Sequence, residues 1–270
     1  MMQRILSTLA CLLSMAWPVV AEAPSVRLTV LLTPERAKAS NLEALRPVLT
    51  VSNRGRIVVA GPNNVLLLGR GQLLFDTPTP VSDCVFTPDG ALLMISGRRL
   101  GYGAGGRFHP QIDLPENAMR LAVGRERIYV YGGDNDKATA LYMVDPQRGH
   151  AKLCALPYPI SAASVVGDTL YFAAGNEIYR LVPDGEMNLI CHLPGPAIAA
   201  LAAAENETLY FLAGRTLYTW QVGKVGIISE GVGDIACWQA GALYVLDTEK
   251  RLLIKLENLP SLGESPQETP

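Results

Sequence analysis

Short apolar runs of strand length recur along the chain, and most of them end at glycine, asparagine, aspartate or proline. One phrase, an apolar and β-rich cluster followed by a small residue, occurs six times. It starts at Ile57, Leu92, Ile128, Leu170, Leu209 and Leu243. These starts are 35, 36, 42, 39 and 34 residues apart. A period of about 40 residues built from several short strands is typical of β-propeller blades.

The clearest repeat runs from Ile160 to Pro196. It predicts four strands, at 161–166, 169–174, 177–182 and 187–193. The junctions carry Gly, Asn or Asp, which tolerate the backbone conformations of tight hairpin turns. Four antiparallel strands joined in this way form one blade, and stacking blades in a ring covers every sheet face.

The last repeat has only three evident strands, at 235–239, 242–246 and 252–256. The segment Val26–Leu32 alternates like a strand and precedes the first blade. We therefore predict that it completes the last blade and closes the ring. The expected fold class is all-β, a single six-bladed β-propeller over residues 22–260.

Two segments do not match the repeat template. Residues 34–45 have a helix-forming composition, and we expect a loop or a short helix there. Residues 197–204 (AIAALAAA) favour a helix by propensity, but the repeat phase places an inner strand at this position. We predict the strand, because tertiary context often overrides propensity.

The two chain ends are expected to lie outside the propeller. Arg4 precedes a mostly apolar run from Ile5 to Val20, and small residues follow at Ala21 and Ala23, which is the pattern of a secretory signal peptide over residues 1–21. The alternative, a retained membrane anchor, would require a run of about 20 apolar residues. Residues 261–270 are polar, and we expect a disordered tail. The expected location is the periplasm, with secretion as the alternative.

The composition argues against two classes of protein. Apolar residues make up 49% of the chain and the formal net charge is −2. A disordered chain would be less hydrophobic and more highly charged. Nucleic-acid binding is not expected either, because the chain has no excess of basic residues.

The turn Phe86-Thr87-Pro88-Asp89-Gly90 and the repeated Leu-Tyr-Phe/Val strands followed by Gly resemble six-bladed propellers of the TolB-like and NHL-like kind. The resemblance covers about residues 26 to 260 and concerns the fold. It implies functions as different as periplasmic scaffolds and metal-dependent lactonases or lyases with a site in the central channel, so the fold alone does not decide the function.

An enzyme of the second kind would need ligands at the channel mouth. The loops that enter the inner strands carry Asp83, Glu116, Arg120 and Asp234. The three carboxylates are candidates for holding Ca²⁺ or another divalent cation. The corresponding positions in blades four and five are small and mostly apolar, so we instead expect strand-end carboxylates that are solvated or paired with Arg120. No catalytic residue and no cofactor are predicted.

The other chemical signals favour structural roles. After the signal peptide the cysteines are Cys84, Cys154, Cys191 and Cys237. Their predicted positions in the blades do not favour disulfide pairing, so we expect free thiols. The run 101–106 matches G-x-G-x-x-G, but Pro110 follows where a dinucleotide-binding helix would begin. We expect this run to be a flexible connection within a blade.

These observations together predict an exported, non-enzymatic propeller that acts as a protein-interaction or scaffold module in the bacterial cell envelope. Its partner would be an envelope or secreted protein, and no transmembrane segment is expected after signal cleavage. The alternative is a metal-dependent, lactonase-like hydrolase or lyase that uses Asp83, Glu116 and Asp234. Sugar or peptidoglycan binding is a third alternative.

Overall fold

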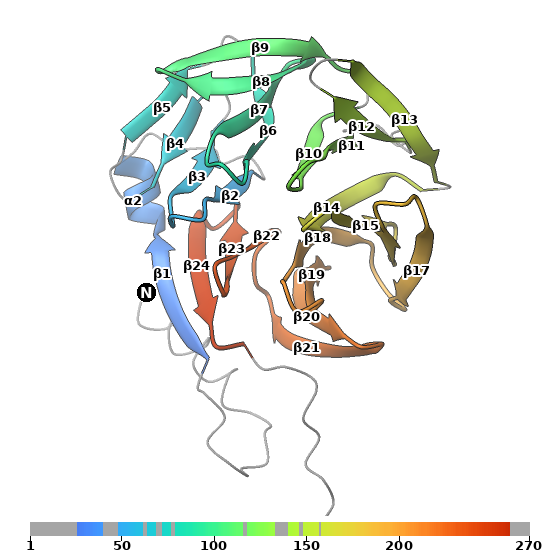
Figure 1. Cartoon of the computed structure of the whole chain (residues 1–270). Coiled ribbons are helices and arrows are strands. Elements are labelled where there is room, and N and C mark those ends of the chain that lie inside the picture. The colour runs from blue at the N-terminus through green and yellow to red at the C-terminus, as the bar shows by residue number, and fades with distance from the viewer. Residues whose placement is uncertain are drawn as a thin grey trace, which may run out of the picture.

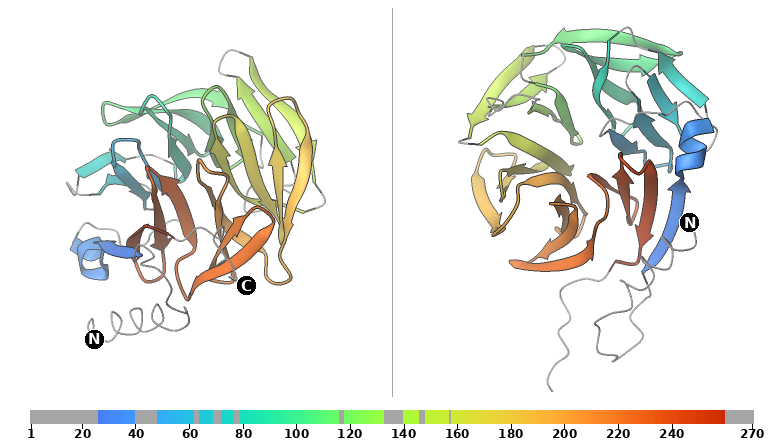
Figure 2. Two further views of the ribbon diagram at one scale, coloured as in Figure 1. Left: turned by 60° about the horizontal axis from the view of Figure 1, so that its bottom comes forward. Right: turned by 180° about the vertical axis from the view of Figure 1, so that it is seen from behind.

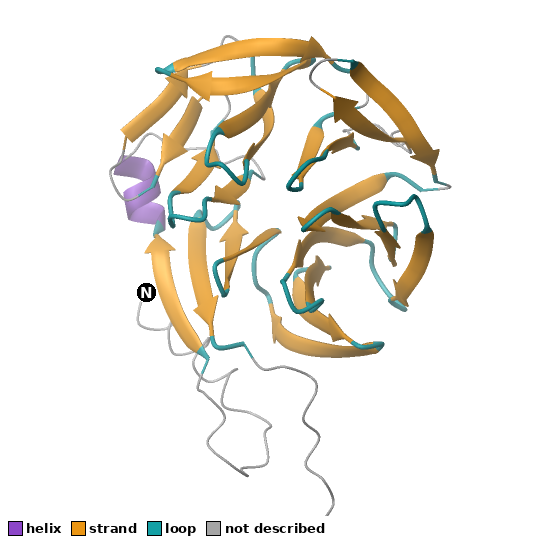
Figure 3. Cartoon of the chain, viewed as in Figure 1, coloured by secondary structure: helices purple, strands orange, loops and turns teal. Residues whose placement is uncertain are grey.

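Six four-stranded antiparallel sheets surround a central axis in the computed structural model (Figure 1), and strands dominate the ordered elements (Figure 3). Each sheet is one blade of a six-bladed β-propeller, as predicted. The structure describes residues 26–39, 48–61, 64–68, 72–76, 79–115, 118–132, 140–145, 148–156 and 158–259. The predicted signal peptide and the predicted polar tail lie outside these residues.

Within blades 1 to 5, consecutive strands pair in chain order from the axis outward. Blade 1 contains β2 (Leu49–Val51), β3 (Ile57–Ala60), β4 (Asn64–Leu67) and β5 (Gln72–Asp76). Blade 2 contains β6 (Val81–Phe86), β7 (Leu92–Ser96), β8 (Arg99–Ala104) and β9 (Arg107–Asp113). Blade 3 contains β10 (Arg120–Val123), β11 (Ile128–Tyr131), β12 (Ala140–Asp145) and β13 (Gly149–Ala155).

The second half of the ring follows the same plan. Blade 4 contains β14 (Ile160–Val166), β15 (Thr169–Ala174), β16 (Glu177–Leu181) and β17 (Met187–His192). Blade 5 contains β18 (Ile198–Ala203), β19 (Leu209–Ala213), β20 (Thr216–Gln221) and β21 (Lys224–Glu230). Blade 6 takes β22 (Ile235–Gln239), β23 (Ala242–Asp247) and β24 (Leu252–Glu257) from the end of the chain.

The fourth strand of blade 6 comes from the other end of the described chain. Strand β1 (Arg27–Leu32) pairs antiparallel with β24, in a register that places Leu28 opposite Leu256 and Val30 opposite Ile254. Figures 1 and 2 show the blue strand β1 beside the red strands of blade 6. The predicted closure of the ring by an N-terminal strand is confirmed.

The two segments that did not match the repeat template contain one short helix and one strand. Helix α2 (Pro34–Ala39) covers the described part of the first segment, whose residues 40–45 lie outside the described ranges, and β18 is an inner strand despite its alanine content. The expectation for residues 101–106 was partly wrong. Gly101 to Ala104 lie within β8, and only Gly105 and Gly106 form the turn to β9. Gly101 is required by packing, because a Cβ atom there would lie 2.1 Å from the His109 carbonyl oxygen.

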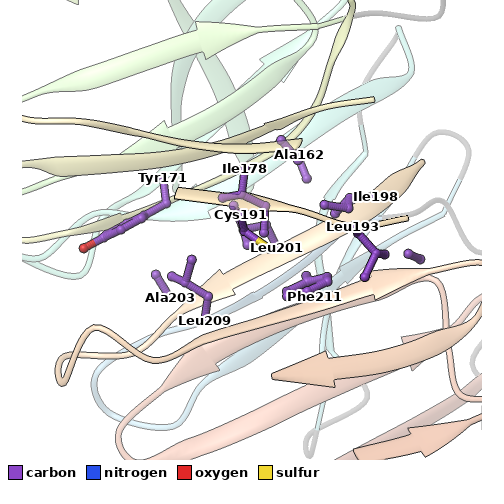
Figure 4. Close-up of a cluster of buried hydrophobic side chains, with 12 residues drawn as sticks. Ala162, Tyr171, Ile178, Cys191, Leu193, Ile198, Leu201, Ala203, Leu209 and Phe211 are labelled. Carbon is purple, nitrogen blue, oxygen red and sulfur yellow. The ribbon is translucent and has the colours of Figure 1, made fainter. Parts of the chain in front are cut away.

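The hydrophobic core is divided among the interfaces between blades. Figure 4 shows the interface of blades 4 and 5, where Tyr171 and Ile178 of blade 4 belong to the same buried cluster as Leu201 and Phe211 of blade 5. The blades come closest near the axis, so the inner strand β18 has room there mainly for small side chains. This geometry explains why an alanine-rich segment forms a strand at this position.

Ring closure by β1 can be tested with two N-terminal truncations. A chain that starts at Pro34 lacks β1, which leaves the edge of β24 unpaired and removes Leu32, a side chain that is 2% exposed in the core between blades 6 and 1. We expect its free energy of unfolding to fall by more than the ~2 kcal/mol typical of truncating one buried leucine. The control chain starts at Ser25 and keeps β1. Equal urea midpoints for the two chains would contradict the closure.

Candidate functional site

The innermost strand of each blade is the edge of its sheet, and its free side faces the axis. Together these six strands line a central cavity of about 210 Å³. Along an edge strand, alternate backbone N–H groups have no partner within the sheet. These N–H groups are therefore available to the polar side chains of the channel.

Asp83 lies in the inner strand β6 and is buried. Its Oδ1 atom accepts a hydrogen bond from the Cys84 backbone N–H at 2.9 Å, in its own strand. Its Oδ2 atom accepts one from the Leu121 backbone N–H at 2.8 Å, in the inner strand of blade 3. The carboxylate thus links two neighbouring blades through their free edges.

Two further side chains of the channel belong to the same polar cluster. Arg120 lines the cavity and attracts the Asp83 carboxylate electrostatically. Tyr131, on β11, is buried, and its hydroxyl accepts a hydrogen bond from the Ala163 backbone N–H of blade 4 at 3.0 Å. Burial, and then the nearby charge of Asp83, raise the pKa of Tyr131 above its usual range. The tyrosine therefore stays neutral.

The same arrangement recurs around the channel. Thr50 Oγ1 of blade 1 accepts a hydrogen bond from Phe86 N of blade 2 at 3.0 Å. Ser164 Oγ of blade 4 accepts one from Ala203 N of blade 5 at 3.0 Å. In each case a side chain of one blade satisfies the free inner edge of the next. These polar side chains link neighbouring blades through their oxygen atoms.

The structure does not bring the two described candidate ligands, Asp83 and Asp234, into one site. Asp83 lines the central cavity, whereas Asp234 does not, and the Asp234 carboxylate instead accepts hydrogen bonds from the backbone N–H and the hydroxyl of Thr248. Glu116 lies outside the described residues. Within the described part of the chain, no three His, Cys, Asp or Glu side chains are placed to hold a metal ion. Arg120 beside Asp83 also opposes a cation, since like charges repel.

The four cysteines of the propeller are free thiols in the structure. Burial raises the pKa of all four, and raises that of Cys237 to about 11. A thiol that remains protonated is a poor nucleophile. In the described ranges, moreover, no helix is both long and apolar enough to span a membrane.

A second cavity, of about 350 Å³, was not predicted from the sequence. It lies on the face of the ring that carries the turn between the first and second strands of every blade, which we call the turn face. All six blades contribute to its lining, which includes Arg125, Glu205, Trp238 and Gln239. The turns that carry the lining lie far apart in sequence and share no motif.

Comparisons with known proteins agree with this architecture. No protein-family model matches the chain, and no curated protein does. Virginiamycin B lyase from Staphylococcus aureus is similar in structure, with a TM-score of 0.60, 16% identity, and coverage of 77% of this chain and 79% of that one. A gluconolactonase from Xanthomonas campestris gives 0.69 at 12% identity, covering 88% and 91%. A chain of a mitotic checkpoint complex gives 0.61 at 12%, covering 90% and 97%.

What these structures share with the chain is the propeller fold. At such low identity the likeness shows nothing finer than the fold, and proteins with very different roles have it. The role of this chain therefore depends on its own residues.

The environment of Asp83 predicts an unusual dependence of stability on pH. Burial raises its pKa from 3.8 to about 6, although Arg120 and the two backbone N–H groups act in the opposite direction. The folded state therefore binds this proton more tightly than the unfolded state does. Between about pH 4 and pH 6 the contribution of Asp83 to the free energy of unfolding should fall as pH rises, by on the order of 2–3 kcal/mol, and stay level above that window.

Urea unfolding of the wild type and of Asp83→Asn across this window measures the effect. The asparagine has nearly the same shape but does not titrate, so the difference in stability between the two proteins should vary with pH in the direction stated. Parallel pH profiles for the two proteins would show that Asp83 has an ordinary pKa in the fold.

Proposed function

We propose that the protein is exported and acts as a non-enzymatic protein-interaction module in the bacterial cell envelope. Two features support this proposal. The polar side chains of the channel hydrogen-bond to the backbone of neighbouring blades, which leaves few of their groups for chemistry on a substrate. The outer rim of the ring, in contrast, carries exposed apolar side chains that nothing in the described chain covers.

The exposed apolar residues of the rim carry the proposal. All the large hydrophobic side chains found exposed in the described residues belong to blades 3, 4 and 5, and most lie on their outermost strands β13, β17 and β21. They are Leu153, Tyr158, Met187, Leu189, Val222, Val225 and Ile227. Ile227 is 60% exposed and Leu189 52%. We call this set the apolar rim.

The apolar rim extends over three consecutive outer strands (Figure 1). Each of these strands pairs on one side only, so its backbone is also open to a further strand. Exposed apolar surface that extends over several elements is characteristic of protein-interaction sites. The outer strand β9 of blade 2 is instead polar and contains Pro110, which makes it a suitable control surface.

The partner that this surface favours is a protein with an apolar face or a free strand edge. Electrostatic attraction contributes little, because the chain has a net charge of only −2. The structure from the mitotic checkpoint complex is an example of a similar fold inside an assembly. In this chain, participation in an assembly would depend on the apolar rim.

Gel filtration of the envelope extract of the native host tests the interaction. We expect the wild-type protein to elute in a complex larger than the purified chain. The double variant Leu189→Asp and Ile227→Asp should elute at the size of the isolated chain, because a charge at each site opposes burial in an interface. The control Gln111→Asp places a charge on β9 and should leave the complex intact.

Circular dichroism of the purified proteins checks that all variants fold. Elution of the wild type as an isolated chain would contradict the proposal, as would a double variant that remains in the complex. Self-association is recognised because the purified wild type would then elute at the larger size by itself.

Export is tested separately by N-terminal sequencing of the mature protein. Signal cleavage after Ala21 predicts a periplasmic or secreted protein that starts at Glu22. A cytoplasmic protein that starts at the initiator methionine would contradict export.

A further inference from the structure

The cavity on the turn face combines residues that the proposed interaction does not use. Its lining includes Asn53 of blade 1, Arg125 of blade 3, Glu205 of blade 5 and Trp238 of blade 6. The apolar rim is on the outer strands, whereas this cavity surrounds the axis of the ring. A ligand could therefore bind here independently of a protein partner at the rim.

Trp238 is the central feature of this cavity. It lies near the end of the inner strand β22, is partly exposed, and lines both the turn-face cavity and the channel. Its ring stacks on Tyr210 with the centroids 5.2 Å apart and the planes 16° from parallel. Its Nε1 atom donates a hydrogen bond to Glu205 Oε2 at 2.8 Å. The indole ring is thus fixed in orientation before any ligand arrives.

Two polar residues of the lining have side chains without a partner in the described part of the chain. Arg125 and Gln239 both contribute to the cavity lining, and neither side chain makes a hydrogen bond or ion pair with another described residue. The backbone that carries Arg125 is nevertheless held in place. Arg125 N donates to the Gly167 carbonyl at 3.0 Å, and the next N–H, that of Glu126, donates to Asp168 Oδ1 at 3.0 Å.

The turns on the other side of the cavity are also tied to one another. The Asn53 side-chain amide donates to the Pro88 carbonyl at 3.3 Å, and Arg56 donates to the Gly90 carbonyl at 2.8 Å. These contacts join blades 1 and 2 at the turn face. A site built on connected turns loses little conformational entropy when a ligand binds.

We propose that the turn-face cavity binds a saccharide. The flat indole of Trp238 matches the C–H face of a sugar ring, and the Gln239 amide together with the free oxygen of Glu205 can hydrogen-bond to hydroxyl groups. The Arg125 guanidinium suits a carboxylate, so acidic sugars are favoured over neutral ones. The cavity volume of about 350 Å³ is at the small end of known ligand sites, which are about 300–1,000 Å³.

Tryptophan fluorescence provides a local measurement of binding. The chain has three tryptophans, Trp17, Trp220 and Trp238, and Trp17 is absent from a protein that starts at Glu22. In that protein Trp220→Phe leaves Trp238 as the only tryptophan. Titrations use glucuronic acid, glucose and sodium acetate. We expect both sugars to change the emission, glucuronic acid to bind about tenfold more tightly because of its charged hydrogen bond, and acetate to have no effect.

Three variants of this single-tryptophan protein assign the contacts. Arg125→Ala should remove the preference for glucuronic acid over glucose, and Gln239→Ala should weaken both sugars. The control Arg54→Ala removes an exposed positive charge from the same face outside the cavity and should change neither affinity. Saturation-transfer NMR on the wild-type protein repeats the titrations without any substitution.

The outcomes that would overturn the proposal are distinct. If neither sugar changes the Trp238 emission or gives a saturation-transfer signal, the cavity is not a saccharide site. If acetate alone gives the same change as glucuronic acid, the cavity is a simple anion site. If Arg125→Ala and Arg54→Ala behave alike, Arg125 does not recognise the carboxylate. Each of these results leaves the proposed interaction at the rim untouched.

Discussion

The free inner edges of the blades are the constraint on which this ring depends. Every blade has an inner strand whose alternate N–H groups cannot be paired within its own sheet, and buried unpaired N–H groups are costly. Side chains of the preceding blade satisfy them, through Thr50, Asp83, Tyr131 and Ser164. Hydrogen bonds between a side chain of one blade and the backbone of the next therefore run around most of the channel.

The hydrogen bonds between blades engage polar side chains of the channel, and this bears on where a functional site can lie. Asp83 would be the natural catalytic candidate in a cavity at the axis, yet both of its oxygens accept backbone hydrogen bonds and Arg120 lies beside it. The two proposals place recognition at other surfaces, the apolar rim and the turn face. The rim offers apolar area, and the turn-face cavity offers an ordered aromatic ring with unused polar groups.

The repeat made most of the fold predictable from the sequence. The position of residues 198–203 within the repeat predicted an inner strand, although their alanine content favours a helix. The last repeat lacks a fourth strand, which predicted that the strand at residues 27–32 closes the ring. The site was less predictable. Asp83 and Asp234 occupy similar places near the starts of inner strands, but only the three-dimensional structure shows that Thr248 binds the second carboxylate. The turn-face cavity takes two or three residues from a turn of each blade, and no sequence pattern marks such a set.

Amide hydrogen exchange in the wild-type protein, resolved by residue with NMR, is the direct test of side-chain bonding at the inner edges. The N–H groups of Phe86, Leu121, Ala163 and Ala203 have no partner within their sheets, and we expect slow exchange because side chains of the preceding blade bind them. Exchange of these four groups as fast as that of the unpaired N–H groups on the outer edges of β17 and β21 would contradict this expectation.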